Sequence, residues 1–193
     1  CKSIFIEQKP IVYKTNIKTS LLKFFYSILT NKSYRVAKFY SHKMQEYVDR
    51  TIENIYLDVI IVCHDSMMQY IPDGFSNKVI YVEIDIISSL YKQYIIIENN
   101  IIKKIIYLIE YKKLLKYEKK ILGIPSRIWS VSHCDIEYLI KLGISKKIIT
   151  YLPIPISSKY LYRWNKNNKN ILFVGSFYWK PNYDGILWFL NEI

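Results

Sequence analysis

The sequence has few of the residues that build disulfide-bonded or metal-bound frameworks. Its three cysteines, Cys1, Cys63 and Cys134, are far apart and form no CxxC pair. Disulfide-rich domains and structural zinc sites both need cysteines at characteristic, mostly short spacings, so neither class is supported. Cys63 ends an apolar run and is expected to be buried as a small hydrophobic residue. We therefore expect no metal ion and a reducing, cytoplasmic location.

Long hydrophobic runs and glycine-rich signatures are absent as well. Lysines such as Lys23, Lys103 and Lys104 interrupt the apolar stretches. None of these stretches therefore reaches the roughly 18 residues that a membrane span needs. The start lacks a charged leader followed by an unbroken apolar run, which predicts no signal peptide. The five glycines form no GxGxxG motif, so generic dinucleotide binding is poorly supported.

Acidic residues are too few to balance the basic ones. The chain has 28 Lys and Arg against 16 Asp and Glu, a formal net charge of +12. Such a charge fits nucleic acid, an anionic membrane surface or phosphorylated ligands. The lysines are dispersed, and neither an arginine stripe nor a nucleic-acid-binding fingerprint occurs, so a solvated surface is the simpler interpretation. We expect no specific nucleic-acid partner, and a peripheral contact with the inner face of an anionic membrane stays open.

What the sequence does have is an alternation of two hydrophobic patterns, with 51% hydrophobic residues in all. Short apolar runs predict buried strands at 58–63, 78–83, 127–131, 147–152 and 170–174. Helical periodicity predicts helices at 20–29, 33–54, 100–122, 134–142 and 182–193. In the helix over 100–122, the stripe of Ile101, Ile105, Leu108 and Leu115 is expected to face the core. The alternation predicts an α/β protein with a mainly parallel sheet.

A segment without periodicity separates two parts of the chain. Residues 156–170 are rich in Ser, Lys and Asn, follow Pro153 and Pro155, and have the composition of an interdomain linker. They predict a first domain over 1–155 and the start of a second over 171–193. The chain begins with Cys1 in place of Met and stops inside an apolar-periodic segment, so both ends are expected to be cut.

Candidate functional residues follow the predicted strands. In open parallel sheets, ligands bind beyond the carboxyl ends of the strands. Side chains able to bind hydroxyls, protons or phosphates follow four strands: His64, Asp65 and Ser66; Asp85 and Ser88; Ser132, His133 and Asp135; and Ser176 after Gly175. Serine and aspartate at such places are also ordinary helix caps. For Ser132 and Asp135, capping is the commoner use, and a role in a cleft stays open beside it.

The last of these segments has the pattern of a phosphate loop. Gly175 and Ser176 lie between a predicted strand and a helix whose first turn carries Pro181. A strand, a glycine turn and a helix N-terminus can together host a phosphate group. Gly175, Ser176 and Asn182 are therefore the candidate phosphate-binding residues.

This region also resembles a known family. The segment ILFVGSFYWKPNYDGILWFLNEI at 171–193 closely resembles the opening of the donor-binding domain in family-4 glycosyltransferases. There, a strand ending in Phe-Val-Gly precedes a Pro-Asn pair and a helix with Trp-Phe. Further likeness to the family's first domain lies in Glu110, the Tyr117-Glu118 pair, Val131-Ser132 with Asp135, and Tyr151-Leu152-Pro153. Asp85, Ser88 and Tyr91 are similar to an Asp-x-x-Ser-x-x-Tyr variant found in sugar transferases of cell-envelope clusters.

The resemblance implies a GT-B enzyme. The first domain would be Rossmann-like and bind the acceptor, and 171–193 would be the first strand and helix of the donor-binding domain. The implied activity is retaining transfer of a sugar from a nucleotide-sugar donor to a lipid-linked or polysaccharide acceptor, without a cofactor or an obligatory metal. An inactive truncated remnant and a basic nucleic-acid-binding module are the alternatives.

The resemblance also assigns roles to the candidate residues. Asp85 and His64 are the catalytic candidates. The acceptor-side cleft would hold Ser88, Ser132 and His133, and the donor loop Gly175, Ser176 and Asn182. Many relatives place a histidine in the loop where this chain has Ile84 and Asp85. The family's donor-gripping glutamates lie in a part that would follow Ile193, so we expect these residues alone to bind a nucleotide weakly.

Overall fold

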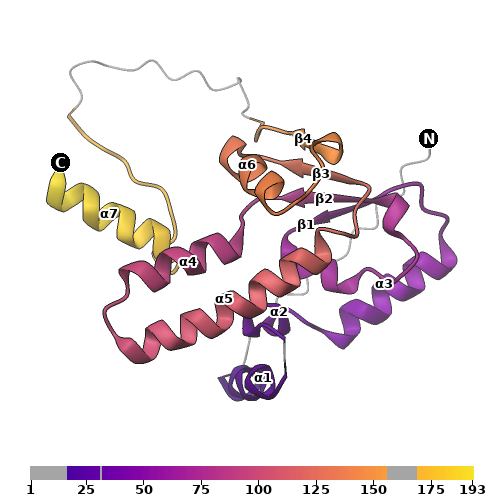
Figure 1. The fold of residues 1–193 in the computed structure, drawn as a ribbon, viewed down its shortest axis with the longest axis horizontal. Helices are drawn as coiled ribbons and strands as arrows, with labels where there is room; N and C mark the ends of the chain where they lie inside the picture. Colours follow the sequence, from indigo (N-terminus) through magenta and orange to yellow (C-terminus); the bar gives the residue numbers. More distant parts are fainter. Residues whose placement is uncertain (1–16, 31, 156–168) are drawn as a thin grey trace. The chain divides into compact units, whose positions relative to one another are not determined.

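The computed structural model describes residues 17–30, 32–155 and 169–193. The chain divides into two compact units, Cys1–Ile154 and Pro155–Ile193. Figure 1 shows the elements of each. Among the described residues, no helix has both the length and the apolar character needed to cross a membrane.

The first unit is built on a parallel sheet, as the alternating pattern predicts. Its strands are β1 (Ile60–Cys63), β2 (Val79–Glu83), β3 (Arg127–Ser130) and β4 (Ile149–Tyr151), in the order β1-β2-β3-β4. Ile60 pairs with Val79, Ile80 with Arg127, and Ile128 with Ile149. In the described sheet, β1 is an outer strand with a neighbour on one side only. Cys63 is therefore exposed, and the expectation that it is buried was wrong.

Helices connect and cover the strands (Figure 1). They are α1 (Ile17–Leu29), α2 (Tyr34–Lys38), α3 (His42–Asn54), α4 (Ile87–Ile97), α5 (Ile101–Ile121) and α6 (His133–Lys141), with short 3-10 turns η1 (Asp65–Tyr70), η2 (Ser76–Lys78) and η3 (Lys146–Ile148). The main core joins strand residues such as Val79 and Ile128 to Met68 of η1, Ile121 of α5 and Leu139 of α6. A smaller cluster joins Val36, Ile87 and Leu114.

The predicted helix over 33–54 is two helices, and the break between them has a tertiary cause. Ser33 caps α2 as expected, and Ser41 caps α3 by accepting a hydrogen bond from the Met44 amide. The Tyr70 hydroxyl donates to the Phe39 carbonyl at 2.5 Å and accepts from the Ser41 amide at 2.8 Å. The Lys23 ammonium donates to the carbonyls of Lys38 and Tyr40. These partners replace the hydrogen bonds that a continuous helix would have made.

The helix over 100–122 is confirmed as α5, but its inner face was predicted wrongly. Asn100 caps it, and its buried residues are Glu110, Leu114, Glu118 and Ile121. Ile101, Ile105 and Leu108 of the predicted stripe are exposed instead. The preceding helix, α4, was not predicted. It packs against α5, and the tyrosine rings of Tyr91, Tyr94 and Tyr107 meet between the two at centroid distances of 5.5 to 5.9 Å.

The second unit contains α7 (Lys180–Glu192), with Pro181 in its first turn. The predicted strand over 170–174 was wrong, because these residues form no strand. A strand is stable only when its backbone groups pair with a neighbour, and no partner strand is present for them in the described residues.

Candidate functional site

The polar segments that follow β1, β2 and β3 lie along one edge of the sheet. These strands are parallel neighbours, so their carboxyl ends share that edge. His64 directly follows β1, Asp85 lies just beyond β2, and Ser132 lies just beyond β3. This edge is where an open parallel sheet binds ligands.

His64 has a strained backbone. Its φ of 73° is positive, which among the described non-glycine residues is found at His64 alone, and its ψ is 143°. Holding a non-glycine residue in such a region costs about 1 to 3 kcal/mol and is common at functional sites. The sharp turn directs the next two residues, Asp65 and Ser66, into the interior, while the His64 side chain stays exposed.

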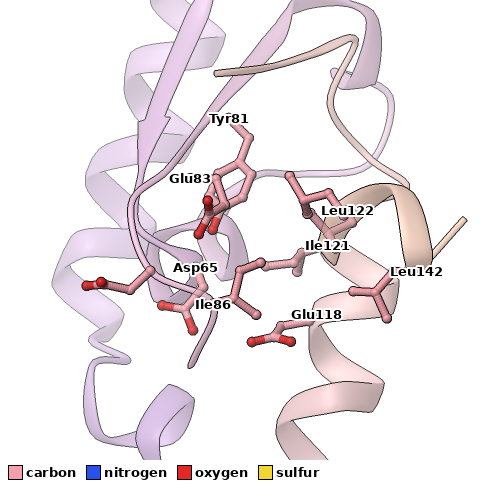
Figure 2. Close-up of a pocket in the computed structure, with 10 residues that line it drawn as sticks. Asp65, Tyr81, Glu83, Ile86, Glu118, Ile121, Leu122 and Leu142 are labelled. Atoms are coloured by element: carbon pink, nitrogen blue, oxygen red, sulfur yellow. The ribbon is translucent and has the colours of Figure 1, made fainter. Parts of the chain in front are cut away.

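Buried carboxyl groups gather beneath this edge. Asp65 of η1, Glu83 at the end of β2 and Glu118 of α5 are each no more than 5% exposed. Together with Asp85 and apolar side chains such as Leu139, they line a cavity of about 10 Å³, which has room for about one water molecule. Figure 2 shows the three carboxyl groups around this space, approaching from different elements.

Each of the three carboxyls has one hydrogen-bonded oxygen and one without a partner. Asp65 accepts from the Ser66 amide at 2.7 Å, Glu83 from the Ser130 hydroxyl at 3.1 Å, and Glu118 from the Ser88 amide at 2.8 Å. The second oxygen of each is buried and unpartnered. An unpartnered buried carboxylate oxygen is costly, so protonation or a ligand in the cavity would stabilise the cluster.

Burial raises the pKa of all three carboxyl groups. Removal from water raises the pKa of Glu83 to about 8, with the Asp135 carboxylate adding to the effect and the Ser130 hydrogen bond opposing it. Burial likewise raises the pKa of Glu118 to about 7 and raises the pKa of Asp65. A protonated carboxyl can donate as well as accept a hydrogen bond. Glu83 and Glu118 can therefore hold protons close to neutral pH.

Asp85 and His64 are exposed at this edge. Asp85 lines the cavity, and its side chain reaches the surface. Asp85 lines the same cavity as Asp65, and His64 directly precedes Asp65 in the chain, so both lie near the Asp65 carboxyl. An exposed carboxylate or imidazole at this edge can bind and deprotonate a hydroxyl group.

The other first-unit candidates have structural partners. Ser88 is fully buried, and its hydroxyl lies 3.4 Å from the Tyr138 hydroxyl. Ser132 caps α6 by accepting from the Asp135 amide at 3.4 Å, which is the capping role. The His133 ring stacks on Tyr151 of β4 at a centroid distance of 4.0 Å. His133 is exposed at the carboxyl edge of the sheet, whereas Ser88 is buried.

In the second unit, the phosphate-loop candidates are neighbours. The Asn182 side-chain amide donates to the Ser176 carbonyl at 3.2 Å, and the Trp179 amide donates to the same carbonyl at 3.1 Å. A Cβ atom at position 175 would lie 2.8 Å from the Phe173 ring and 2.9 Å from the Asn182 amide, so a larger residue there would displace these two side chains. These contacts form a compact turn before α7.

Two residues of the edge were not recognised as site residues from the sequence. Glu83 is a carboxylate that closes an otherwise apolar strand, and that break in pattern was an available signal. Glu118 lies on a helix whose buried face was assigned wrongly. Among the described residues, no group of three or more His, Cys, Asp or Glu side chains is placed to hold a metal ion.

Comparison with known proteins gives one relative. No protein-family model matches the chain, and no solved structure matches it. The chain is 27% identical over 197 residues to an uncharacterized 44.6 kDa protein in the cps region of Klebsiella pneumoniae. The alignment covers 100% of the chain and 46% of that protein, so the chain spans about half the length of its relative.

Proposed function

We propose that this chain contributes the acceptor-side domain of a GT-B glycosyltransferase that acts in the synthesis of capsule or another cell-envelope polysaccharide. The enzyme would transfer a sugar, with retention, from a nucleotide-sugar donor to a lipid-linked or polysaccharide acceptor. The observation that carries the proposal is the position of exposed Asp85 and His64 beside the buried carboxyl Asp65, at the carboxyl edge of a parallel sheet.

This geometry suits a sugar acceptor. Glycosyl acceptors present hydroxyl groups that must lose a proton, and a carboxylate or an imidazole within hydrogen-bond reach can take it. Asp85, which lines the cavity, and His64, which directly precedes Asp65, are exposed groups of that kind. The relative in a cps region supports the polysaccharide context, and the resemblance of 171–193 to a donor-binding domain supports the nucleotide sugar.

Loss of the Asp85 carboxylate tests the proposal. We expect Asp85→Asn, made in the longer transferase to which this chain would contribute, to lower the incorporation of labelled sugar from UDP- and GDP-linked donors, in cells that express it, by roughly a hundredfold or more. Asp58→Asn is the matched control, because Asp58 is exposed and precedes β1 at the opposite edge of the sheet.

His64→Ala should lower incorporation as well, without changing the amount of folded protein. Equal incorporation by Asp85→Asn, Asp58→Asn and the unmodified protein would contradict a catalytic role for this edge. An absence of incorporation even by the unmodified longer protein, with every donor, would contradict the transferase itself.

A further inference from the structure

Helix α5 has an exposed side that changes character along its length. This side holds five aliphatic residues of the first half, each 40% to 68% exposed, and four exposed lysines of the second half. At 100° per residue, all nine lie within one third of the helix circumference. We call this surface the α5 outer face: Ile101, Ile102, Ile105, Leu108 and Ile109, followed by Lys112, Lys116, Lys119 and Lys120.

The charge of this face is uncompensated. The two acidic residues of α5, Glu110 and Glu118, are on its buried side. Glu110 accepts from the Ser33 hydroxyl at 2.5 Å and from the Arg35 amide at 3.0 Å, and Glu118 accepts from the Ser88 amide. In the part of the chain that the structure describes, no carboxylate forms an ion pair with the four lysines.

The apolar half continues onto α4. Ile96 and Ile97, at the end of α4, are 71% and 56% exposed, and only three residues separate them from Ile101. The tyrosine cluster between the helices holds this hairpin together, and α4 and α5 extend together beyond the sheet (Figure 1). An exposed aliphatic patch of this extent marks an interaction surface.

We propose that the α5 outer face docks the protein on an anionic lipid membrane. Interfacial helices combine a bulky aliphatic surface, which enters the boundary between headgroups and acyl chains, with lysines that meet anionic headgroups. The division along α5 fits a helix that dips into the membrane at its N-terminal end and lies over the headgroups at its C-terminal end.

Two other binding partners, a second copy of the chain and nucleic acid, do not match the charges and apolar residues of this surface. A second copy of the chain would bring lysines against lysines in molecules that each carry +12. Nucleic acid would engage the lysines but leave the isoleucines in water, because phosphate contacts use cationic groups. Only a surface that is both anionic and apolar matches both halves. This inference does not depend on the proposed transferase activity.

Vesicle co-sedimentation of the full chain tests the inference. We expect binding to vesicles of phosphatidylcholine mixed with phosphatidylglycerol, and at least roughly tenfold weaker binding to phosphatidylcholine alone, because each lysine near an anionic surface raises the affinity about fivefold. The triple change Ile102→Ser, Ile105→Ser and Ile109→Ser should weaken binding to the mixed vesicles at least tenfold. A second triple change, Lys112→Gln, Lys116→Gln and Lys119→Gln, should weaken binding to the mixed vesicles by the same factor.

Matched controls change the same residue types on other elements. Lys43→Gln, Lys141→Gln and Lys146→Gln remove the same charge from exposed positions on α3, α6 and η3, and Ile61→Ser, Ile140→Ser and Ile154→Ser remove exposed isoleucines. Both control sets should bind as the unmodified chain does. Near-ultraviolet circular dichroism checks that every variant is folded.

Three outcomes would overturn the inference. One is binding that is equal for neutral and anionic vesicles, or equal for the α5 and control sets. The second is a dimer in sedimentation velocity that the α5 isoleucine substitutions dissociate, which would assign the face to a second copy. The third is tight binding of duplex DNA at physiological salt that the α5 lysine substitutions abolish.

Discussion

At the scale of single residues, the buried carboxyls at the sheet edge set how stability depends on pH. A glutamate in the unfolded chain ionises near pH 4.5, whereas Glu83 in the folded chain keeps its proton up to about pH 8. Between these values the folded state binds more protons than the unfolded state, so the free energy of unfolding falls as the pH rises. The contribution of Glu83 is therefore greatest in acid and lost above its folded pKa.

We predict that Glu83→Gln flattens this dependence. The free energy of unfolding of the unmodified chain should fall between pH 5 and 8, by up to about 1.4 kcal/mol per pH unit for each proton that the folded state holds. Glu83→Gln removes one of these protons, so its slope should be smaller. Urea denaturation at several pH values measures both slopes. Glu137→Gln, an exposed glutamate on α6, is the control and should keep the original slope. Equal slopes for Glu83→Gln and the unmodified chain would show that Glu83 is ionised in the fold.

The strained backbone of His64 predicts an unusual order of stability for two variants. At ordinary positions glycine is less stable than alanine, because it loses more conformational freedom on folding. Position 64 has a positive φ, which glycine adopts without strain and alanine does not. We predict that His64→Gly is more stable than His64→Ala by about 1 kcal/mol in urea denaturation. The reverse order would mean that the turn relaxes to an ordinary conformation.

At the scale of elements, hydrogen bonds to Glu110 join the start of α2 to α5. Its carboxylate accepts from the Ser33 hydroxyl and from the backbone amides of Tyr34 and Arg35 at the start of α2. A negative charge at a helix N-terminus is favourable, and hydrogen bonds to charged groups are stronger than neutral ones. The contact joins segments that are 75 to 77 residues apart in the chain.

We predict that Glu110→Ala lowers the free energy of unfolding by about 2 to 3 kcal/mol, because it leaves the buried Ser33 hydroxyl and the α2 amides without an acceptor. Glu110→Gln, which keeps an acceptor oxygen but no charge, should cost less. Glu137→Ala on exposed α6 should change stability by no more than about 0.5 kcal/mol. Chemical denaturation measures these changes. Similar losses of free energy of unfolding for Glu110→Ala and Glu137→Ala would show that Glu110 does not stabilise the contact between α2 and α5.

At the scale of the whole molecule, the charge of +12 predicts weak and unspecific affinity for nucleic acid. Scattered lysines bind phosphates by releasing condensed counterions, so their affinity falls steeply with salt. We predict that fluorescence polarisation detects binding of duplex DNA at low salt, with equal affinity for unrelated sequences, and none at physiological salt. Binding that survives there and discriminates between sequences would favour a nucleic-acid-binding module.

The sequence by itself determined the class of the first unit. Its short apolar runs could be buried only as strands of a parallel sheet, and all four strands of that sheet were predicted. Polar residues directly after the strands marked the edge at which His64 and Asp85 lie. These features were predictable because each depends on residues within a few positions of one another along the chain.

Tertiary structure decided the features that depend on distant partners. The break between α2 and α3 is stabilised by Tyr70 and Lys23, neither of which is near it in sequence. The segment over 170–174 has the pattern of a strand but forms none, because a strand needs a partner. The two sides of α5 could not be distinguished by hydrophobicity, since its buried side holds Glu110 and Glu118, whereas the isoleucines of its first half are exposed. The buried glutamates are stable there because Ser33 and Ser88, far away in the chain, supply the hydrogen bonds that replace water.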